Sequence, residues 1–145
     1  MYFLGNIPNY LIRYKFVSNK STQFLKVYFV KKYDELDIEL LSIQVGCILR
    51  YERLRRKLSQ ESLGQIIGSN SMMIGRIERA ENACSWKILL LLAQHLNIEF
   101  SDLLNLQNKD NILDIIEKSI ELEEKLTQDK KDFYKFLKKR VNKYN

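Results

Sequence analysis

The side chains best suited to chemistry lie in one short stretch, residues 70–79. Ile74 and Ile77 are three positions apart, so in a helix both would face a core. The opposite side, toward solvent, would then carry Ser71, Met72, Gly75, Arg76 and Arg79. Arginine offers a fork of N–H donors that matches planar acceptors, and serine offers a short hydroxyl. This set favours recognition of polar edges on a partner over bond-making chemistry.

The remaining sequence shows no catalytic or metal-binding constellation. There is no glycine-rich phosphate loop, no pair of carboxylates in a plausible cleft and no nucleophile with a base. His95 is the only histidine and has no second ligand nearby, so we expect it to be structural. Cys47 and Cys84 lack CxxC or Cys/His spacing, which favours reduced thiols over a redox pair. We therefore expect no enzymatic activity, no cofactor and no metal.

The composition is that of a small helical protein with excess basic residues. Its 145 residues suit one compact domain of about a hundred residues or fewer, plus appendages. A single proline and five glycines favour helices, and the net charge of +6 suits an anionic partner. No signal peptide and no run long enough to span a bilayer is present, so we expect a cytoplasmic protein without membrane contact.

Two short helices joined by a tight turn would position the exposed face. Ser59 can cap the first helix, and Glu61 complements its positive end. The apolar side of that helix carries Leu63, Ile66 and Ile67. Gly68 can adopt the left-handed conformation that ends a helix, and Asn70 can cap the next one. This is the geometry of a helix-turn-helix.

Residues 45–104 resemble the phage repressor and Cro type of helix-turn-helix protein, also called XRE-like. The family pattern runs Gly-x-x-Leu-x-x-x-Arg, then Ser-Gln-x-x-Leu-Ala, then Ile-x-x-Ile-Glu-x-Gly. The chain matches it at Gly46, Leu49, Arg53, Ser59, Gln60, Leu63, Ile74, Ile77 and Glu78. Further matches to the last two helices of the family are Leu89, Leu92, Ala93, Leu96, Ile98, Phe100 and Leu103. The resemblance implies a five-helix domain.

The resemblance also implies that the second helix of the motif lies in the major groove of DNA. Ser71, Met72 and Arg76 would meet base edges, with Arg76 reading guanine and Met72 packing on a thymine methyl group. Gln60 matches the family's glutamine that touches DNA, and Gln60 with Asn70 would fix the register. The expected DNA-binding set is completed by Gly75 and Arg79.

Arg53 and Glu78 correspond to a pair of residues that form an ion pair in the family. Such a pair would pin the first helix to the end of the recognition helix. The sequence departs from the family just after this point. Ala80 replaces the usual glycine, Cys84 replaces the usual proline, and acidic Glu81 stands where neutral or basic residues often approach a phosphate.

Segments on both sides extend the domain. Residues 1–33 form an arm in which 10–17 and 24–30 are aromatic and β-branched, which slightly favours a β-hairpin over a helical or loose leader. Residues 34–57 read as a long first helix. Residues 107–145 carry an apolar stripe as one helix or two, and we expect this stripe to hold two subunits together. Its members are Ile112, Ile115, Ile116, Ile120, Leu122, Leu126, Phe133, Phe136, Leu137 and Val141.

The sequence thus predicts a mainly α protein in three parts: an arm at 1–33, a repressor-like domain at 34–106 and a helical extension at 107–145. The expected function is a transcriptional regulator that binds an inverted-repeat operator in double-stranded DNA as a homodimer. The alternative is a protein-interaction or antitoxin-like module that keeps the fold and binds a protein partner. Such a partner would bind the arm or the C-terminal helices.

Overall fold

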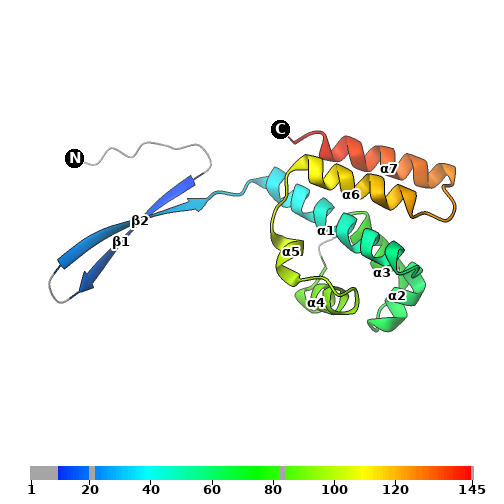
Figure 1. Cartoon of the computed structure of the whole chain (residues 1–145), viewed down its shortest axis with the longest axis horizontal. Coiled ribbons are helices and arrows are strands. Elements are labelled where there is room, and N and C mark those ends of the chain that lie inside the picture. The colour runs from blue at the N-terminus through cyan, green and yellow to red at the C-terminus, as the bar shows by residue number, and fades with distance from the viewer. Residues whose placement is uncertain (1–9, 20–21, 82–83, 145) are drawn as a thin grey trace. The chain divides into compact units, whose positions relative to one another are not determined.

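The structure is a computed structural model that describes residues 10–19, 22–81 and 84–144, with side chains described from residue 32 onward. The chain divides into two compact units, residues 1–35 and 36–145 (Figure 1). The described residues form one β-hairpin and seven helices. The predicted mainly α class is therefore confirmed.

The hairpin pairs β1, Tyr10–Asn19, with β2, Thr22–Lys31, in antiparallel register. Tyr10 lies opposite Lys31 and Asn19 lies opposite Thr22, so all ten positions of each strand are paired. Aromatic and β-branched residues favour such extended backbone. Of the two alternatives that the sequence leaves open, the described residues adopt the hairpin. Residues 1–9 and 20–21 of the predicted arm lie outside the described residues.

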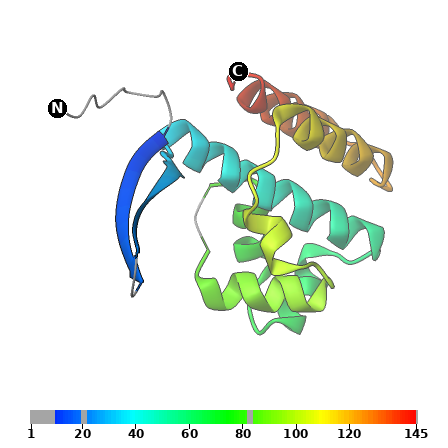
Figure 2. The ribbon, with the colours of Figure 1, turned by 60° about the vertical axis from the view of Figure 1, so that its left-hand side comes forward.

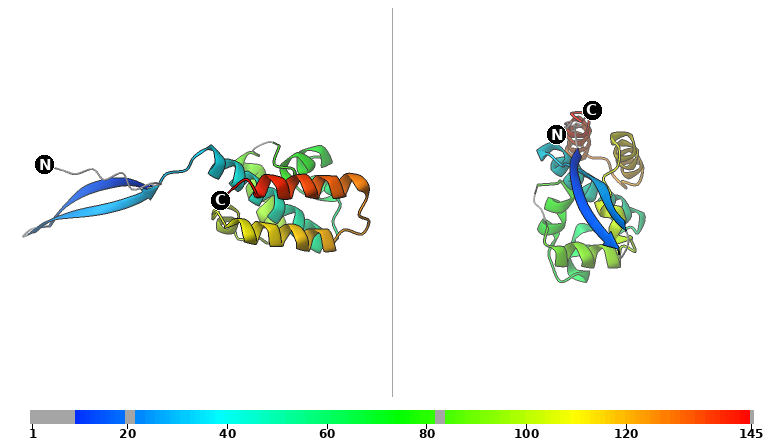
Figure 3. Two further views of the ribbon diagram at one scale, coloured as in Figure 1. Left: turned by 90° about the horizontal axis from the view of Figure 1, so that it is seen from above. Right: turned by 90° about the vertical axis from the view of Figure 1, so that its left-hand side faces the viewer.

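Five helices follow in the order expected of a repressor-like domain, and two more complete the chain. The five are α1 Glu35–Arg55, α2 Gln60–Ile66, α3 Ser71–Glu78, α4 Trp86–His95 and α5 Phe100–Leu104. The C-terminal extension consists of α6 Lys109–Glu121 and α7 Gln128–Val141. The extension is thus a hairpin of two helices rather than one long helix. The two helices run side by side (Figure 3, left).

Local signals explain the turn between α2 and α3. The Ser59 hydroxyl accepts a hydrogen bond from the Ser62 amide at 2.9 Å, and the Asn70 side chain accepts one from the Met73 amide at 2.9 Å. Each cap satisfies an N–H group that has no partner inside its helix. Gly68 takes a φ of +68°, a left-handed conformation that costs glycine little.

The first hydrophobic core joins α1 to the four helices that follow it. Its buried members include Leu49, Leu63, Ile74, Leu92 and Leu103, one from each of the five helices. On the apolar side predicted for α2, Leu63 and Ile67 are buried, but Ile66 is 47% exposed. Gly64 is buried on α2 instead.

A second core covers another side of α1 and buries part of the apolar stripe of the extension. The buried members of this core are Leu40, Ile43, Cys47, Ile112, Ile116, Tyr134, Leu137, Val141 and Tyr144. In Figure 2, α1 lies between α4 and α5 on one side and α6 and α7 on the other. Phe136, Leu122 and Leu126 of the same stripe stay 59%, 37% and 36% exposed, so the chain covers only part of the stripe and its role in holding two subunits together stays a prediction. Sequence periodicity shows that a face is apolar but not what covers it.

α4 exposes more apolar surface than its sequence suggests. The Trp86 side chain is 66% exposed and contacts Phe100 edge-on, with ring centroids 6.1 Å apart. Leu90, one helical turn further along, is 51% exposed. Leu89 and Leu92 are buried, so α4 has one face in the core and one apolar strip outside it.

Two buried residues of α1 explain how closely the other helices approach it. A Cβ added to Gly46 would lie 2.7 Å from the carbonyl oxygen of Ile77 and 2.9 Å from that of Glu78, so only glycine allows α3 this near. The Gln44 side chain is fully buried and donates to the carbonyl oxygens of Leu103 and Asn105 at 3.1 and 2.9 Å. Gln44 thereby holds the end of α5.

Candidate nucleic-acid interface

The outer side of α3 presents a short row of uncommitted side chains. Ser71, Met72 and Arg76 are exposed, with Met72 at 63%. Ile74 and Ile77 are buried beneath them at 2% and 4%. The 3.6-residue repeat thus separates an anchoring side from an exposed side, as the sequence predicts.

Gly75 does not lie on that exposed side. It is buried under the side chains of Arg79 and Gln60, and an added Cβ would lie 2.9 Å from Arg79 Nη1 and 3.3 Å from Gln60 Oε1. The expectation that Gly75 faces solvent is therefore wrong. The side chains of Arg79, at the end of α3, and Gln60, at the start of α2, fold across it, which periodicity alone does not indicate.

Arg79 and Gln60 are also engaged within the chain. Arg79 Nε donates to Glu81 Oε1 at 2.6 Å, and this hydrogen bond raises the pKa of Arg79. Gln60 Nε2 donates to Glu78 Oε2 at 2.9 Å. Asn70 caps α3 through its side chain. Of the residues expected at the interface, Ser71, Met72 and Arg76 are those that lie exposed on α3 with no cap or ion pair of their own in the described residues.

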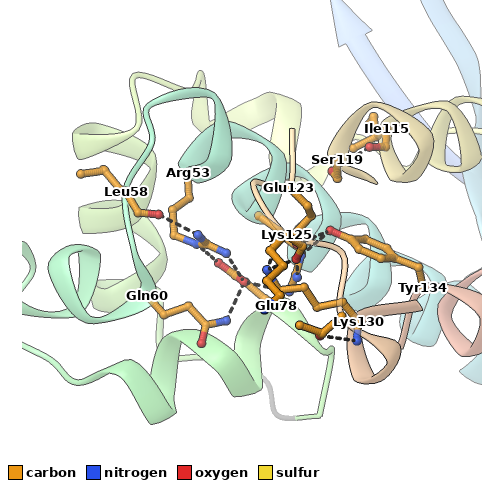
Figure 4. A network of polar contacts seen from close by, with 12 residues as sticks. Arg53, Leu58, Gln60, Glu78, Ile115, Ser119, Glu123, Lys125, Lys130 and Tyr134 are labelled. Carbon is orange, nitrogen blue, oxygen red and sulfur yellow. Dashed lines mark hydrogen bonds and ion pairs between the residues drawn. The ribbon is translucent and has the colours of Figure 1, made fainter. Parts of the chain in front are cut away.

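The inner end of α3 holds a buried carboxylate. Glu78 is 1% exposed, and Arg53 grips it with two hydrogen bonds, from Nε at 2.6 Å and from Nη2 at 3.0 Å (Figure 4). Arg50 Nη1 adds a third contact at 3.3 Å. Arg53 also donates to the carbonyl oxygen of Leu58 at 2.7 Å, so the guanidinium links α1, the start of α2 and the end of α3.

This geometry agrees with the comparison against known families. A helix-turn-helix family model matches residues 49–103. This segment is an XRE-like helix-turn-helix domain. The family consists of DNA-binding regulators that are typically not enzymes. The searches of curated proteins and of solved structures returned no match.

No helix among the described residues of the helix-turn-helix domain or its extension is long and apolar enough to cross a membrane. The same residues contain no group of three or more histidine, cysteine, aspartate or glutamate side chains that could hold a metal ion. Cys47 is buried in the second core, where burial raises its thiol pKa to about 12 and leaves it a small apolar residue.

A polar network connects the helix-turn-helix domain to its extension. Arg50 Nε donates to the Tyr134 hydroxyl at 2.8 Å, and Arg50 Nη2 donates to Glu123 Oε1 at 2.6 Å. The Tyr134 hydroxyl donates to the same Glu123 oxygen at 2.7 Å, and Lys130 pairs with the other (Figure 4). The network therefore runs from α7 through Arg50 to Glu78, at the end of α3.

Burial and hydrogen bonds shift the pKa values of Glu123 and Tyr134 in this network. Burial alone would raise the pKa of Glu123, but hydrogen bonds from Lys130, Tyr134 and Arg50 hold that pKa below its ordinary value. Burial raises the pKa of Tyr134, which keeps its hydroxyl protonated and able to donate. Sequence reasoning missed Arg50, Glu123 and Tyr134, because Arg50 lies 73 positions from Glu123 and 84 from Tyr134.

The loop after α3 shows the structural consequences of two departures from the family pattern, at Ala80 and Glu81. Ala80 takes a φ of +51°, in the left-handed region where the family's usual glycine carries no Cβ penalty. The Glu81 carboxylate accepts hydrogen bonds from Arg79, which lower the pKa of the Glu81 carboxyl. Residues 82–83 lie outside the described residues.

Proposed function

We propose that this protein is a sequence-specific transcriptional regulator whose recognition helix, α3, enters the major groove of double-stranded DNA. The observation that carries the proposal is the exposed row Ser71, Met72 and Arg76 on a helix whose opposite side is fully anchored. An arginine can make two hydrogen bonds to guanine, and a methionine can pack on a thymine methyl group. Gln60 and Asn70 shape and hold this helix pair, which fixes the register of the reading residues.

Phosphate contacts would come from basic side chains around the motif. The chain carries a net charge of +6, whereas residues 43–104 alone carry only +2. Most of the excess lies in residues 130–145, which hold seven basic residues and one acidic residue. Contacts of this kind add affinity without sequence preference and weaken with salt.

Regulators of this type read inverted repeats when a two-fold axis presents two recognition helices about 34 Å apart. We propose a homodimer of this kind. Because α6 and α7 bury much of their stripe within the chain, we take the support mainly from α4. There Trp86 and Leu90 stand four positions apart, exposed and apolar, on the same side of the helix.

A protein partner is the second candidate. The same exposed pair on α4, together with Phe136 at 59% exposure on α7, offers apolar surface that a different protein could cover. The small net charge of residues 43–104, +2, also favours this alternative, as does the pairing of Arg79 with Glu81, because both leave less positive charge for DNA. In that case α3 would keep its fold without reading bases.

Selection of DNA from a random duplex library by the full chain tests the proposed function. We expect enrichment of an inverted repeat and retention of that duplex at salt concentrations that release random DNA. Sedimentation of the protein with the selected duplex gives the number of chains bound, which we expect to be two. Equal retention of selected and random DNA would favour the protein-binding alternative.

A further inference from the structure

The last turns of α7 contact the C-terminal end of the recognition helix. Arg140 Nη1 donates to the carbonyl oxygen of Arg79 at 3.0 Å, and Arg140 Nη2 donates to that of Ala80 at 3.4 Å. The last carbonyl groups of a helix have no partners inside it and form the negative end of its dipole. The Arg140 guanidinium donates hydrogen bonds to these carbonyl groups and also places a positive charge at the negative end of the helix dipole.

Arg140 is itself fixed from two other directions. Its Nε pairs with Glu39 Oε1 on α1 at 3.2 Å, and its guanidinium lies 5.8 Å from the centre of the Phe136 ring. The side chain is only 15% exposed, so it is committed to contacts within the chain. One side chain therefore joins α1, α3 and α7.

A second connection reaches the same end of α3. Tyr134 on α7 and Glu123 just after α6 hold Arg50, which contacts Glu78. The two connections therefore meet α3 at residues 78–80, behind the exposed row that would read DNA. Ala80 at this end has an unfavourable left-handed backbone, so the turn needs support from outside.

We infer that the α6–α7 hairpin is an intramolecular brace that sets the pose of α3, with Arg140 as its positioning residue. The inference rests on the proposed function. Hydrogen bonds to base edges weaken steeply with small errors in distance and angle, so a tilted α3 would lose specific contacts first. DNA affinity then depends on residues that do not touch DNA. The helix-turn-helix match ends at residue 103, so the brace is a property of the extension.

The test compares two variants that lose the same charge from neighbouring positions. Arg140→Met removes the contacts with α3, whereas Lys139→Met removes an exposed charge to which the structure assigns no polar contact with the described residues. The probes are a duplex selected by the unaltered protein and a random duplex. We expect Arg140→Met to weaken binding of the selected duplex by about tenfold, within the range for residues coupled to a site at a distance. Binding of random DNA should change as little as it does in Lys139→Met.

Two further variants separate positioning from unfolding. Arg140→Lys keeps the charge and can reach one carbonyl, so its affinity for the selected duplex should lie between those of the unaltered protein and Arg140→Met. Tyr134→Phe removes only the hydroxyl that links α7 to Arg50 and Glu123, and should also weaken the selected duplex more than the random one. Thermal melting establishes that each variant is folded at the temperature of the binding assay.

Three results would overturn the brace. Equal losses in Arg140→Met and Lys139→Met on both duplexes would make Arg140 a general phosphate-attracting charge. Unchanged binding in folded Arg140→Met would show that α7 only covers the core. If Arg140→Met unfolds, selective loss in Arg140→Lys and Tyr134→Phe supports the brace, and its absence overturns it. Failure of the unaltered protein to select any duplex would instead reject the proposed function, and the brace with it.

Discussion

At the N-terminal end of α3, Ser71 and Met72 are exposed, whereas at its C-terminal end Glu78 is 1% exposed and accepts hydrogen bonds from three side chains. The exposed side chains at the N-terminal end form few contacts within the chain. The C-terminal end is held by residues from α1, α2 and, through Arg50, α7. A reading surface needs free side chains on a backbone that does not move. Most of the polar interactions of α3 among the described residues therefore lie at its C-terminal end.

The largest expected effect on stability comes from removing the extension, α6 and α7, which contacts the C-terminal end of α3. Ending the chain after Gln107 would remove α6 and α7 and expose Leu40, Ile43 and Cys47, which these helices bury. We expect the remaining domain to lose cooperative thermal unfolding, as followed by circular dichroism, because the uncovered side of α1 is apolar. Removing residues 1–31, which belong to the separate hairpin unit, should leave the melting transition of the helices nearly unchanged. A truncated domain that melts like the full chain would contradict the account.

The next effect concerns the buried carboxylate. Glu78→Leu would leave Arg50 and Arg53 without their shared partner, and losing one side of such a buried pair costs about 3–5 kcal/mol. The exposed control Glu81→Leu should change the free energy of unfolding far less than Glu78→Leu does. Adding Arg53→Met to Glu78→Leu should recover part of the loss, because one stranded charge is removed while Arg50 remains. Urea denaturation measures all four proteins, and equal losses at positions 78 and 81 would refute the network.

A smaller effect should appear as a pH dependence. The pKa of Glu123 is lowered in the folded protein, so its contribution to stability is present above its unfolded pKa, about 4.3, and is lost as pH falls through the folded value. Glu123→Gln should therefore be less stable than the unaltered protein at pH 7 and approach it in stability at low pH. Denaturation midpoints between pH 7 and pH 3 measure this convergence. A constant difference at every pH would mean that the carboxylate charge plays no part.

The smallest effect lies at the turn after α3. Ala80 holds a φ of +51°, and glycine removes a Cβ penalty of about 1–2 kcal/mol while adding freedom to the unfolded chain. We expect Ala80→Gly to stabilise the domain by up to about 1 kcal/mol. The same substitution at Ala93, inside α4, should destabilise it by at least roughly 0.5–1 kcal/mol. Losses at both positions would show that Ala80 is unstrained.

The sequence predicted the features of α2 and α3 that depend on residues close to one another in the chain. Ser59 and Asn70 cap their helices and Gly68 ends α2, each through contacts or angles within a few residues. The Arg53–Glu78 contact came from the family resemblance, because 25 positions separate the two residues and no local rule pairs them.

Features that depend on distant packing could not be predicted in the same way. Arg140 reaches the end of α3 across 60 positions, and the fully buried Gln44 bonds residues about 60 positions away. The exposed fractions of Trp86 and Ile66 depend on which neighbours cover them, and hydrophobicity alone does not indicate that both lie largely outside the core. The apolar stripe of α6 and α7 was recognised, but its partner, α1, was not.

The central claim is that the outward side of α3 reads bases. Binding of Arg76→Ala to a selected duplex and to random DNA, beside the control Lys87→Ala on α4, tests it most directly. We predict a loss of about 1–3 kcal/mol on the selected duplex for Arg76→Ala, with random binding almost intact and a smaller, sequence-independent change for Lys87→Ala. Unchanged binding of the selected duplex by Arg76→Ala, or equal losses on both DNAs, would contradict base reading by this residue.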